Sequence, residues 1–288
     1  MRVLIAGAGG QLGTELTAWL RRYRPEWAVH AYRREEWNVS CRRQTEALMR
    51  DLRPDVIVNC AAFTRVDACE TRRLTALRVN AAAPALLARA AQAVGARLVH
   101  ISTDYVFDGQ KGGCYVERDV PRPLNVYGWS KRRGEEAVLA AGEGHLVVRT
   151  AWLYGPRGPN FARWVLDRLQ RGETVAVVRD VIGSPTHTWD LARFLAEVLS
   201  TDATGIVHAA NTGACSRFTF ARTLARLAGL DPEAVRPARA ADFPLPAVRP
   251  LYTPLCSTRV GRLPVTPLRS WQTALAHFVQ RIKKEERA

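Results

Sequence analysis

Long uncharged apolar runs are missing from this chain of 288 residues. None approaches the ~18 residues that a membrane-spanning helix needs, although 47% of the residues are hydrophobic. The first residues lead directly into the apolar segment 2–7, without the layout of a signal peptide. We therefore expect a cytoplasmic protein without a membrane partner, long enough to bury one large core or two moderate ones.

Cysteines in the spacing of a metal site or a disulfide framework are also missing. No two of the six cysteines show Cys-x-x-Cys spacing, which would be typical of a zinc site or a redox centre. In a cytoplasmic chain, scattered cysteines predict reduced thiols and no metal site. The residues concerned are Cys41, Cys60, Cys69, Cys114, Cys215 and Cys256.

Lysine is scarce: only four of the 42 basic residues are lysines, in a chain whose formal net charge is +15. The basic residues are spread along the whole chain rather than collected in a tail or one helix, so the charge does not predict a nucleic-acid partner. A basic field does favour small anionic ligands such as nucleotides and diphosphates.

What the chain does have is a strand, a glycine turn and a helix at its start. Residues 3–6 form a continuous apolar run, as expected for a parallel strand covered on both faces. The glycines that follow allow a tight turn and a close approach to a pyrophosphate, whose charge faces the free N–H groups of the helix start. We expect contacts with a dinucleotide from Gly7, Gly10, Gln11, Leu12 and Gly13.

Two arginines follow the second predicted strand, residues 28–32. An acidic residue near this point accepts hydrogen bonds from the ribose of NAD, whereas arginine suits the 2′-phosphate of NADP. Arg33 and Arg34 therefore favour NADPH, although Glu35 and Glu36 come next and NADH stays the alternative. A solvated charged turn would have the same composition.

Two more strands are predicted, one at residues 55–62 that runs into small residues and one at 98–103. Thr103 ends the later strand, where open parallel sheets place their chemistry, and its hydroxyl can hydrogen-bond a carbonyl oxygen as charge develops. Ordinary β-propensity explains a threonine there equally well. An alanine-rich helix over 77–94 contains Asn80, which is either a tolerated polar residue or a bridge through water to a catalytic lysine.

Tyr127 and Lys131 form the central candidate pair. Residues four apart are neighbours on one helix face, and an ammonium beside a phenol lowers its pKa from about 10 toward neutrality. The pair is therefore a plausible acid/base device. Tyr-x-x-x-Lys spacing is common by chance, so the prediction depends on the glycine turn and Thr103 that precede it.

The alternation of strands and helices continues to a further strand at 145–149 and predicts an α/β fold with a Rossmann-type doubly wound parallel sheet. We assign residues 1–153, continued by about 174–208, to a dinucleotide-binding domain. Residues 154–173 and 209–288 are assigned to a smaller C-terminal α+β substrate-binding lobe, in which 231–268 are expected to be irregular. Trp152 is either a core anchor or a stacking platform for a base or sugar.

The order and spacing of the glycine turn, Asn80, Thr103 and the Tyr127/Lys131 pair resemble the extended short-chain dehydrogenase/reductases. Local strings narrow the resemblance to the dTDP-4-dehydrorhamnose reductase family. They are GQLGTEL at 10–16, NCAAFTRVD at 59–67, STDYVFDG at 102–109, NVYG at 125–128, RTAWLY at 149–154 and GSPT at 183–186. The resemblance covers essentially the whole chain and weakens after about residue 230.

This resemblance implies NAD(P)H-dependent reduction of the C4 ketone of dTDP-4-dehydro-L-rhamnose to dTDP-L-rhamnose. Tyr127 would protonate the new alkoxide, Lys131 would lower the tyrosine pKa and hold the nicotinamide ribose, and Thr103 would hydrogen-bond the carbonyl oxygen. Contacts with the nucleotide-diphosphate sugar are implied for Thr103, Asp104, Tyr105, Trp152 and Arg249, although a structural salt bridge explains Arg249 at least as well. Further cofactor contacts are expected from Asn38, Val39, Ala61, Ala62, Phe63, Thr64 and Ser102.

Three points stay open at this stage. A homodimer is compatible with the resemblance, and some members are linked to magnesium at a glutamate like Glu15, but one glutamate does not predict a metal site. A nucleotide-sugar dehydratase or epimerase is a rival, although the dehydratase usually has Asp-Glu after the threonine and this chain has Asp104-Tyr105. A non-catalytic NADP-binding subunit, as in methionine adenosyltransferase, is the other rival.

Overall fold

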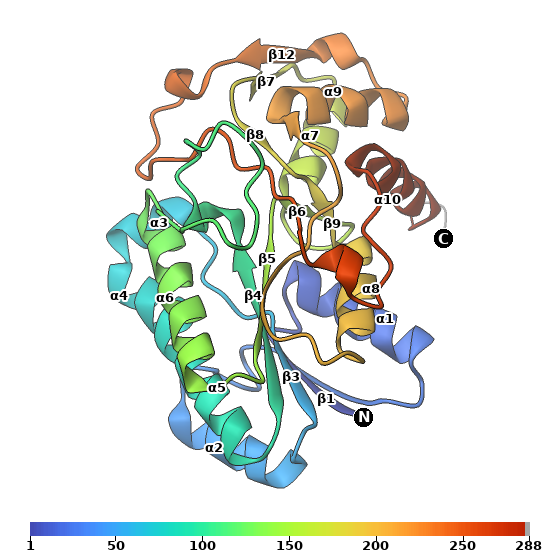
Figure 1. The fold of residues 1–288 in the computed structure, drawn as a ribbon. Helices are drawn as coiled ribbons and strands as arrows, with labels where there is room; N and C mark the ends of the chain where they lie inside the picture. The colour runs from blue at the N-terminus through green and yellow to red at the C-terminus, as the bar shows by residue number, and fades with distance from the viewer. Residues whose placement is uncertain (286–288) are drawn as a thin grey trace.

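A computed structural model describes residues 1–285 of the chain (Figure 1). Six parallel strands form one sheet in the order β10-β5-β4-β3-β1-β2. The predicted parallel α/β sheet is thus confirmed. The strands are β1 (Arg2–Ala6), β2 (Ala28–Tyr32), β3 (Val56–Asn59), β4 (Arg97–Thr103), β5 (Leu146–Thr150) and β10 (Gly205–His208).

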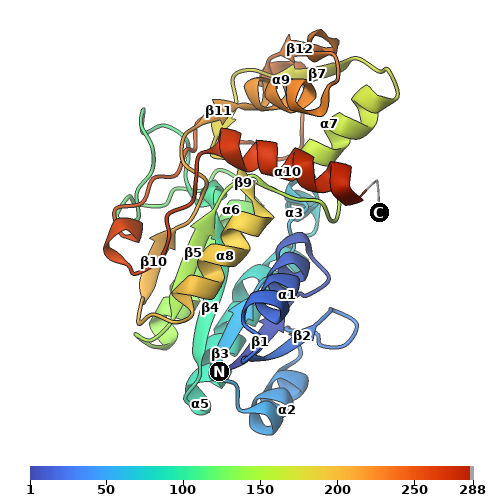
Figure 2. The ribbon, with the colours of Figure 1, turned by 90° about the vertical axis from the view of Figure 1, so that its right-hand side faces the viewer.

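Helices cover both faces of this sheet (Figures 1 and 2). One face carries α1 (Gln11–Tyr23) and α8 (Thr188–Val198), and the other carries α2 (Arg42–Leu52), α5 (Ala83–Ala93) and α6 (Val126–Ala141). Alternate residues of each strand enter two separate cores: Val3 and Ile5 pack on one side of β1, and Leu4 and Ala6 on the other. This double burial is why the strands are continuous apolar runs in the sequence.

The strand order reverses between β1 and β3, which places a crevice at their carboxyl ends. The glycine turn lies at this point, and α1 begins directly after it. Gly7 has a left-handed φ of 78°, and a Cβ on it would lie 2.7 Å from the backbone nitrogen of Ala61. A Cβ on Gly13 would overlap the carbonyl oxygen of Gly7. Only glycine lets the helix start pack this closely on the turn.

The predicted helix over 77–94 is interrupted. After α3 (Val66–Thr71) and α4 (Arg73–Leu77), a π-helical turn at Arg78–Ala82 leads into α5. Buried Asn80 in this turn accepts a hydrogen bond from the Phe63 backbone at 2.8 Å and donates one to the Ser130 hydroxyl at 3.0 Å. Asn80 therefore ties the loop after β3 to α6, a structural role that neither sequence interpretation included.

A second core lies beyond the carboxyl edge of the sheet, in the upper part of Figure 2. It is built by α7 (Phe161–Gln170), α9 (Arg217–Ala228) and α10 (Trp271–Glu285) around side chains such as Phe220 and Phe278. Short strand pairs join this core to the sheet: β6 (Leu153–Tyr154) with β9 (Thr186–His187), and β8 (Ile182–Gly183) with β11 (Cys215–Ser216).

Strand β7 (Val175–Val178) differs from the predicted division of the chain. It pairs in parallel with β12 (Val235–Ala238), not with the large sheet. Val175, Val177 and Val235 are buried in the second core. Residues 174–178 therefore pack with the C-terminal lobe, and the segment 231–268, expected to be irregular, contains a strand.

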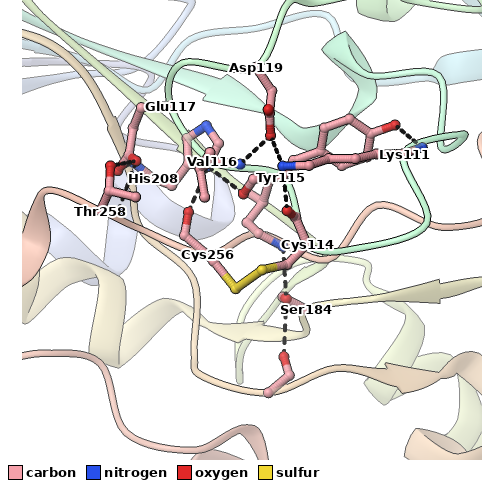
Figure 3. Close-up of a disulfide and its surroundings, with 12 residues drawn as sticks. Lys111, Cys114, Tyr115, Val116, Glu117, Asp119, Ser184, His208, Cys256 and Thr258 are labelled. Atoms are coloured by element: carbon pink, nitrogen blue, oxygen red, sulfur yellow. Dashed lines mark hydrogen bonds and ion pairs between the residues drawn. A yellow bond between two sulfur atoms is a disulfide. The ribbon is translucent and has the colours of Figure 1, made fainter.

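The prediction of six reduced cysteines is wrong for two of them. Cys114 and Cys256 form a disulfide with a Cα–Cα distance of 5.7 Å (Figure 3). Backbone hydrogen bonds run beside it, from Tyr115 N to Pro254 O and from Cys256 N to Tyr115 O, both 2.8 Å. The pair could not be recognised from the sequence, because 142 residues separate the two cysteines and no short spacing links them. The other four cysteines are free thiols.

Residues 1–285 contain neither a membrane-spanning helix nor a cluster of metal ligands. None of the helices there is at once long enough and apolar enough to span a bilayer. The same residues contain no cluster of three or more His, Cys, Asp or Glu side chains that could hold a metal ion. Buried Glu15 accepts a hydrogen bond from Arg281 of α10 at 2.8 Å, so its carboxylate is part of a salt bridge between α1 and α10.

Candidate active site

A cavity of about 300 Å³ lies at the carboxyl ends of the central strands. It brings together the glycine turn, Thr103, Tyr127 and Lys131, which are far apart in the sequence. Its walls also include Trp152 and several residues that the sequence analysis did not assign to a site. The lining residues are Gly10, Gln11, Leu12, Cys60, Ala62, Thr64, Ile101, Ser102, Thr103, Tyr127, Lys131, Thr150, Ala151, Trp152 and Leu153.

The start of α6 fixes Tyr127 against the loop that follows Thr103. Asn125 caps the helix by accepting a hydrogen bond from the Gly128 backbone at 2.8 Å. A Cβ on Gly128 would overlap the carbonyl oxygen of Tyr105, so glycine permits the close approach. The rings of Tyr105 and Tyr127 then meet edge to face, with centroids 5.8 Å apart.

Burial raises the pKa of Tyr127 well above that of a free phenol, and a hydrogen bond with Thr103 opposes this only in part. This differs from the expectation that Lys131 would bring the tyrosine pKa down, because the loss of solvation is the larger effect. At neutral pH the phenol is therefore protonated. A protonated phenol at the wall of the cavity can give a proton to a ligand oxygen.

Lys131 is buried on the same face of α6, and its Nζ donates to the carbonyl oxygen of Ile101 at 2.6 Å. Burial lowers the pKa of Lys131 to about 8, although the carboxylate of Glu135 acts in the opposite direction. Glu135 is itself paired with Arg149 through hydrogen bonds of 2.9 and 2.6 Å. Lys131 therefore changes charge close to neutral pH.

Asp104 lies beneath Thr103 rather than among the residues that line the cavity. It accepts hydrogen bonds from the hydroxyl of Thr103 at 3.1 Å and from that of Thr253 at 2.6 Å. Burial raises the pKa of Asp104 to about 6. Asp104, which was expected to contact the substrate, thus lies behind Thr103 and orients the threonine hydroxyl.

A second cavity of about 690 Å³ adjoins the first one on the side of the C-terminal lobe. Tyr105, Arg217 and Arg249 line it together with apolar side chains. The guanidinium of Arg217 lies 3.6 Å above the ring of Trp152, so this pair joins the two cavities. Arg249 donates to both carboxylate oxygens of Asp67 at 2.6 Å, which is the salt bridge considered from the sequence.

Trp152 is held in an unusual backbone conformation, with a left-handed φ of 45°. Its indole packs directly on Gly183, where a side chain would collide with the ring. Trp152 is therefore neither a buried core anchor nor a free platform: one part packs on β8, and the ring also lines the cavity under Arg217.

The chain is similar to known proteins along almost its whole length. A family model described as RmlD substrate binding domain matches residues 1–284. A dTDP-4-dehydrorhamnose reductase from Mycobacterium tuberculosis (strain ATCC 25618 / H37Rv) is 45% identical over 282 residues, which cover 96% of this chain and 91% of the relative. The chain belongs to the dTDP-4-dehydrorhamnose reductase family. The resemblance inferred from local strings is confirmed.

Two further matches describe the breadth of this family. A dTDP-4-keto-6-deoxy-D-glucose reductase from Streptomyces niveus is 39% identical, and the match covers 99% of each chain. The crystal structure of dTDP-4-dehydrorhamnose reductase from Bacillus anthracis in complex with NADP superposes with a TM-score of 0.93 at 35% identity. That match covers 97% of this chain and 99% of the other.

The other cofactor residues expected for this family do not line this cavity. Ala61 and Phe63 pack beside the turn and on Asn80. Arg33 and Arg34 are exposed, and Arg33 extends past Gly9 to a separate cavity of about 330 Å³ that Arg21 and Arg157 also line. Exposed Asn38 accepts from the Ser40 backbone, while Val39 is buried.

Three buried polar atoms in the cavity wall have no hydrogen-bond partner within the described part of the chain. They are Gln11 Oε1, Ser102 Oγ and Thr150 Oγ1. Buried polar groups are costly unless they are paired. The three atoms could form hydrogen bonds with a polar nucleotide in the cavity. The glycine turn beside them, which has no room for a Cβ at Gly7 or Gly13, also fits such a ligand.

Arg217, Thr253 and Cys60 are site residues that sequence reasoning missed. Thr253 lies 149 positions from Asp104, and Arg217 begins α9 in a region without a recognisable pattern. Cys60 was counted only as a thiol, although the run of small residues around it indicated a close packing surface. No sequence spacing could have connected Arg217 with Trp152.

Proposed function

We propose that this protein reduces the C4 ketone of dTDP-4-dehydro-L-rhamnose to the alcohol of dTDP-L-rhamnose with NADPH. The observation that carries the proposal is the convergence of Thr103, Tyr127 and Lys131 with the glycine turn on one cavity. Ketone reduction needs a hydride on one face of the carbonyl, a proton for its oxygen and a fixed geometry between them. The names of the relatives support this reaction class.

Each of the three side chains has a separate task. Tyr127 keeps its proton at neutral pH because it is buried, and it donates that proton to the substrate oxygen. The hydroxyl of Thr103 donates its one proton to Asp104 in the structure, so Thr103 donates to the same oxygen once that hydroxyl has turned from Asp104 to the substrate. Lys131 stabilises the phenolate that remains, when its amine is charged. A bound nicotinamide supplies the hydride.

The second cavity suits the nucleotide-diphosphate part of the substrate. Arg217 and Tyr105 lie where it meets the first cavity, so a diphosphate there would face a guanidinium. Aromatic side chains farther along the cavity, Phe161, Trp164 and Phe243, offer surfaces for a base. This arrangement would place the sugar ketone between Trp152 and Tyr127.

NADPH is proposed as the cofactor because Arg33 and Arg34 follow β2 and because the relative from Bacillus anthracis was crystallised with NADP. Charged hydrogen bonds are worth about 1.5–3 kcal/mol each. Replacing both arginines by alanine should therefore lower the affinity for NADPH at least tenfold and leave the affinity for NADH nearly unchanged. Fluorescence titration measures both affinities. Arg43→Ala on the exposed side of α2 is the control. Equal losses for both cofactors would mean that neither arginine contacts a 2′-phosphate.

A reductase for a different 4-keto-6-deoxysugar is the second candidate. It is favoured by the relative from Streptomyces niveus, whose name gives dTDP-4-keto-6-deoxy-D-glucose as the compound reduced. The residues around the ketone would serve both substrates, because both require hydride and proton at C4. The choice between them depends on contacts made by the rest of the sugar.

The test is the loss of NADPH absorbance with enzymatically generated dTDP-4-dehydro-L-rhamnose. We expect turnover by the wild type, and a loss of ~100-fold or more in Tyr127→Phe, which retains the ring but not the proton. Affinity for NADPH should be the same in both proteins. Near-normal turnover by Tyr127→Phe would contradict the mechanism. Binding of NADPH without any turnover by the wild type would favour the non-catalytic subunit instead.

A further inference from the structure

Lys131 shares its buried site with a histidine to which the proposed mechanism gives no task. His100 on β4 is fully buried, and its Nε2 lies 3.3 Å from Lys131 Nζ. Its other ring nitrogen, Nδ1, lies 3.1 Å from the amide nitrogen of Asn59. Asn59 and His100 are partners in register on neighbouring strands. The three side chains therefore form one buried polar row from β3 through β4 to α6.

This row is possible because α6 approaches the sheet closely beside Lys131. Gly134 lies one turn further along the helix, and a Cβ there would overlap the carbonyl oxygen of Asn80 and lie 3.5 Å from His100 Nε2. The absence of that side chain lets the helix approach until Lys131 reaches the imidazole.

The backbone sets the direction of the Asn59 amide. Its Oδ1 accepts a hydrogen bond from the Ala61 N–H at 3.1 Å, so its NH₂ group faces His100. A neutral imidazole has one N–H and one lone pair, and the nitrogen that faces a donor must be the one with the lone pair. The hydrogen-bond network thus assigns the lone pair to Nδ1 and the proton to Nε2.

The Nε2–H of His100 consequently points at Lys131 as a donor. An ammonium group has three donors and no acceptor, whereas a neutral amine has a lone pair that can accept from His100. Protonation of the imidazole would not relieve the conflict, because it adds a second donor. The pKa of His100 is in any case well below its ordinary value, since the ring is buried beside Lys131.

Other ionisable groups around Lys131 do not outweigh this contact. Glu135 is the carboxylate that favours the charged amine, and it is shared with Arg149 in a buried salt bridge. Burial raises the pKa of the Cys60 thiol to about 12, so that group is uncharged at neutral pH. Tyr127 on the same helix is also neutral.

We propose that Asn59 and His100 are positioning residues that control the protonation state of Lys131 through this row of hydrogen-bonded side chains. Asn59 fixes the histidine tautomer, and the tautomer favours the neutral amine. In the proposed reaction, Lys131 could then return a proton to Tyr127 after the phenol has given its own to the substrate oxygen. An Nζ–H bond would break, a phenol O–H bond would form, and solvent would reprotonate the amine. Only this kinetic consequence rests on the proposed function.

Nuclear magnetic resonance tests the row without substrate or cofactor. The chain has six histidines and only four lysines, so selective labelling gives few signals. Long-range ¹⁵N spectra of the wild type should show neutral His100 with its proton on Nε2, assigned by comparison with His100→Phe. A proton on Nδ1 would overturn the proposal, and this experiment needs no variant of Asn59.

The charge of Lys131 is then followed by ¹³C-labelled lysine, with Lys131→Arg for assignment. Asn59→Ala frees Nδ1 to carry the proton and lets Nε2 accept from the ammonium. We expect the titration midpoint of Lys131 to rise by about one pH unit, a tenfold gain in proton affinity. Exposed Gln170→Ala, at the end of α7, should leave it unchanged.

A double-mutant cycle shows whether the effect passes through the histidine. In a His100→Phe background, Asn59→Ala should no longer move the Lys131 midpoint. An equal shift in both backgrounds, or no shift from Asn59→Ala alone, would overturn the proposal. A midpoint that moves while the pH profile of NADPH oxidation does not would uphold the positioning role and contradict the part assigned to Lys131 in the reaction.

Discussion

Burial decides the charge of the ionisable side chains around the cavity. It raises the pKa of Tyr127 and that of Asp104, the latter to about 6, and it lowers the pKa of Lys131 to about 8. Loss of solvation always favours the neutral form, so acids and bases move in opposite directions. At neutral pH Tyr127 therefore keeps its proton, whereas Asp104 and Lys131 lie close enough to their pKa values for both protonation states to be populated.

The raised pKa of Asp104 predicts how the free energy of unfolding changes with pH. Its pKa rises from 3.8 to about 6 on folding, so the unionised form is favoured in the folded state. The stabilisation from this group is present below about pH 4 and is lost as the pH rises to about 6, by about 3 kcal/mol in total. The side-chain amide introduced by Asp104→Asn cannot ionise, so the variant should lose less stability than the wild type across this window.

Urea unfolding between pH 4 and 7 measures the difference. Asp242→Asn, at an exposed carboxylate in the C-terminal lobe, is the control for the removal of a negative charge. If the wild type and Asp104→Asn show the same dependence on pH, the carboxyl group of Asp104 is not protonated in the folded protein at the acid end of the window.

Among the elements, the turn between β1 and α1 shows what local sequence can predict. The spacing of its glycines follows from a requirement within seven residues, the close approach of Gly13 to the Gly7 carbonyl. A helix that carries Tyr127 and Lys131 on one face was likewise predicted, because their four-residue spacing is local. Thr103, Tyr127 and Lys131 were found for the same reason: each belongs to a short pattern.

Elements that depend on distant partners were not predictable. Nothing near Val175 in the sequence indicates that β7 pairs with β12, about sixty residues later. The π-helical turn that buries Asn80 depends on hydrogen bonds to Phe63 and Ser130, on two other segments. The same limit applies within the site, where Arg217 and Thr253 gain their roles from contacts across the molecule.

Gly13→Ala tests the turn as a unit. The added methyl group would collide with the carbonyl oxygen of Gly7, so α1 must shift away from β1. Overpacking of this kind lowers the free energy of unfolding by about 1–3 kcal/mol. The displaced helix start should also lower the affinity for NADPH at least tenfold. Thermal unfolding and fluorescence titration measure the two effects.

Gly144→Ala is the matched control, since a methyl group there meets no other atom within 4 Å. It should change neither the melting temperature nor the affinity by a comparable amount. An unchanged affinity in Gly13→Ala would contradict the role of the turn in cofactor binding.

Across the whole molecule, the site exists only because segments from both parts of the chain meet. Gln11 of α1 donates to the carbonyl oxygen of Pro159 at 3.1 Å, and Arg217 of α9 covers Trp152. The Cys114–Cys256 disulfide holds two distant segments together (Figure 3). The segment that carries Cys256 also includes Thr253, the partner of Asp104. A covalent link between distant segments therefore supports the layer beneath Thr103.

Removal of this disulfide should lower the free energy of unfolding. Cross-links that close loops of 100 residues or more contribute up to about 4–5 kcal/mol through the unfolded chain, and this one closes a separation of 142 residues. Cys114→Ser with Cys256→Ser should unfold at a lower urea concentration than the oxidised wild type. Added dithiothreitol should destabilise the wild type and leave the double variant unaffected. Equal urea midpoints in all four samples would show that the bridge contributes no stability.

The most direct measurement follows the hydride and the proton donor together. NADPH deuterated at C4 of the nicotinamide is incubated with dTDP-4-dehydro-L-rhamnose and either the wild type or Tyr127→Phe, and the nucleotide sugar is analysed by mass spectrometry and NMR. We predict dTDP-L-rhamnose with deuterium at the sugar C4 from the wild type, and essentially none from the variant. Deuterated product from both proteins at similar rates, or deuterium at another carbon, would contradict the account.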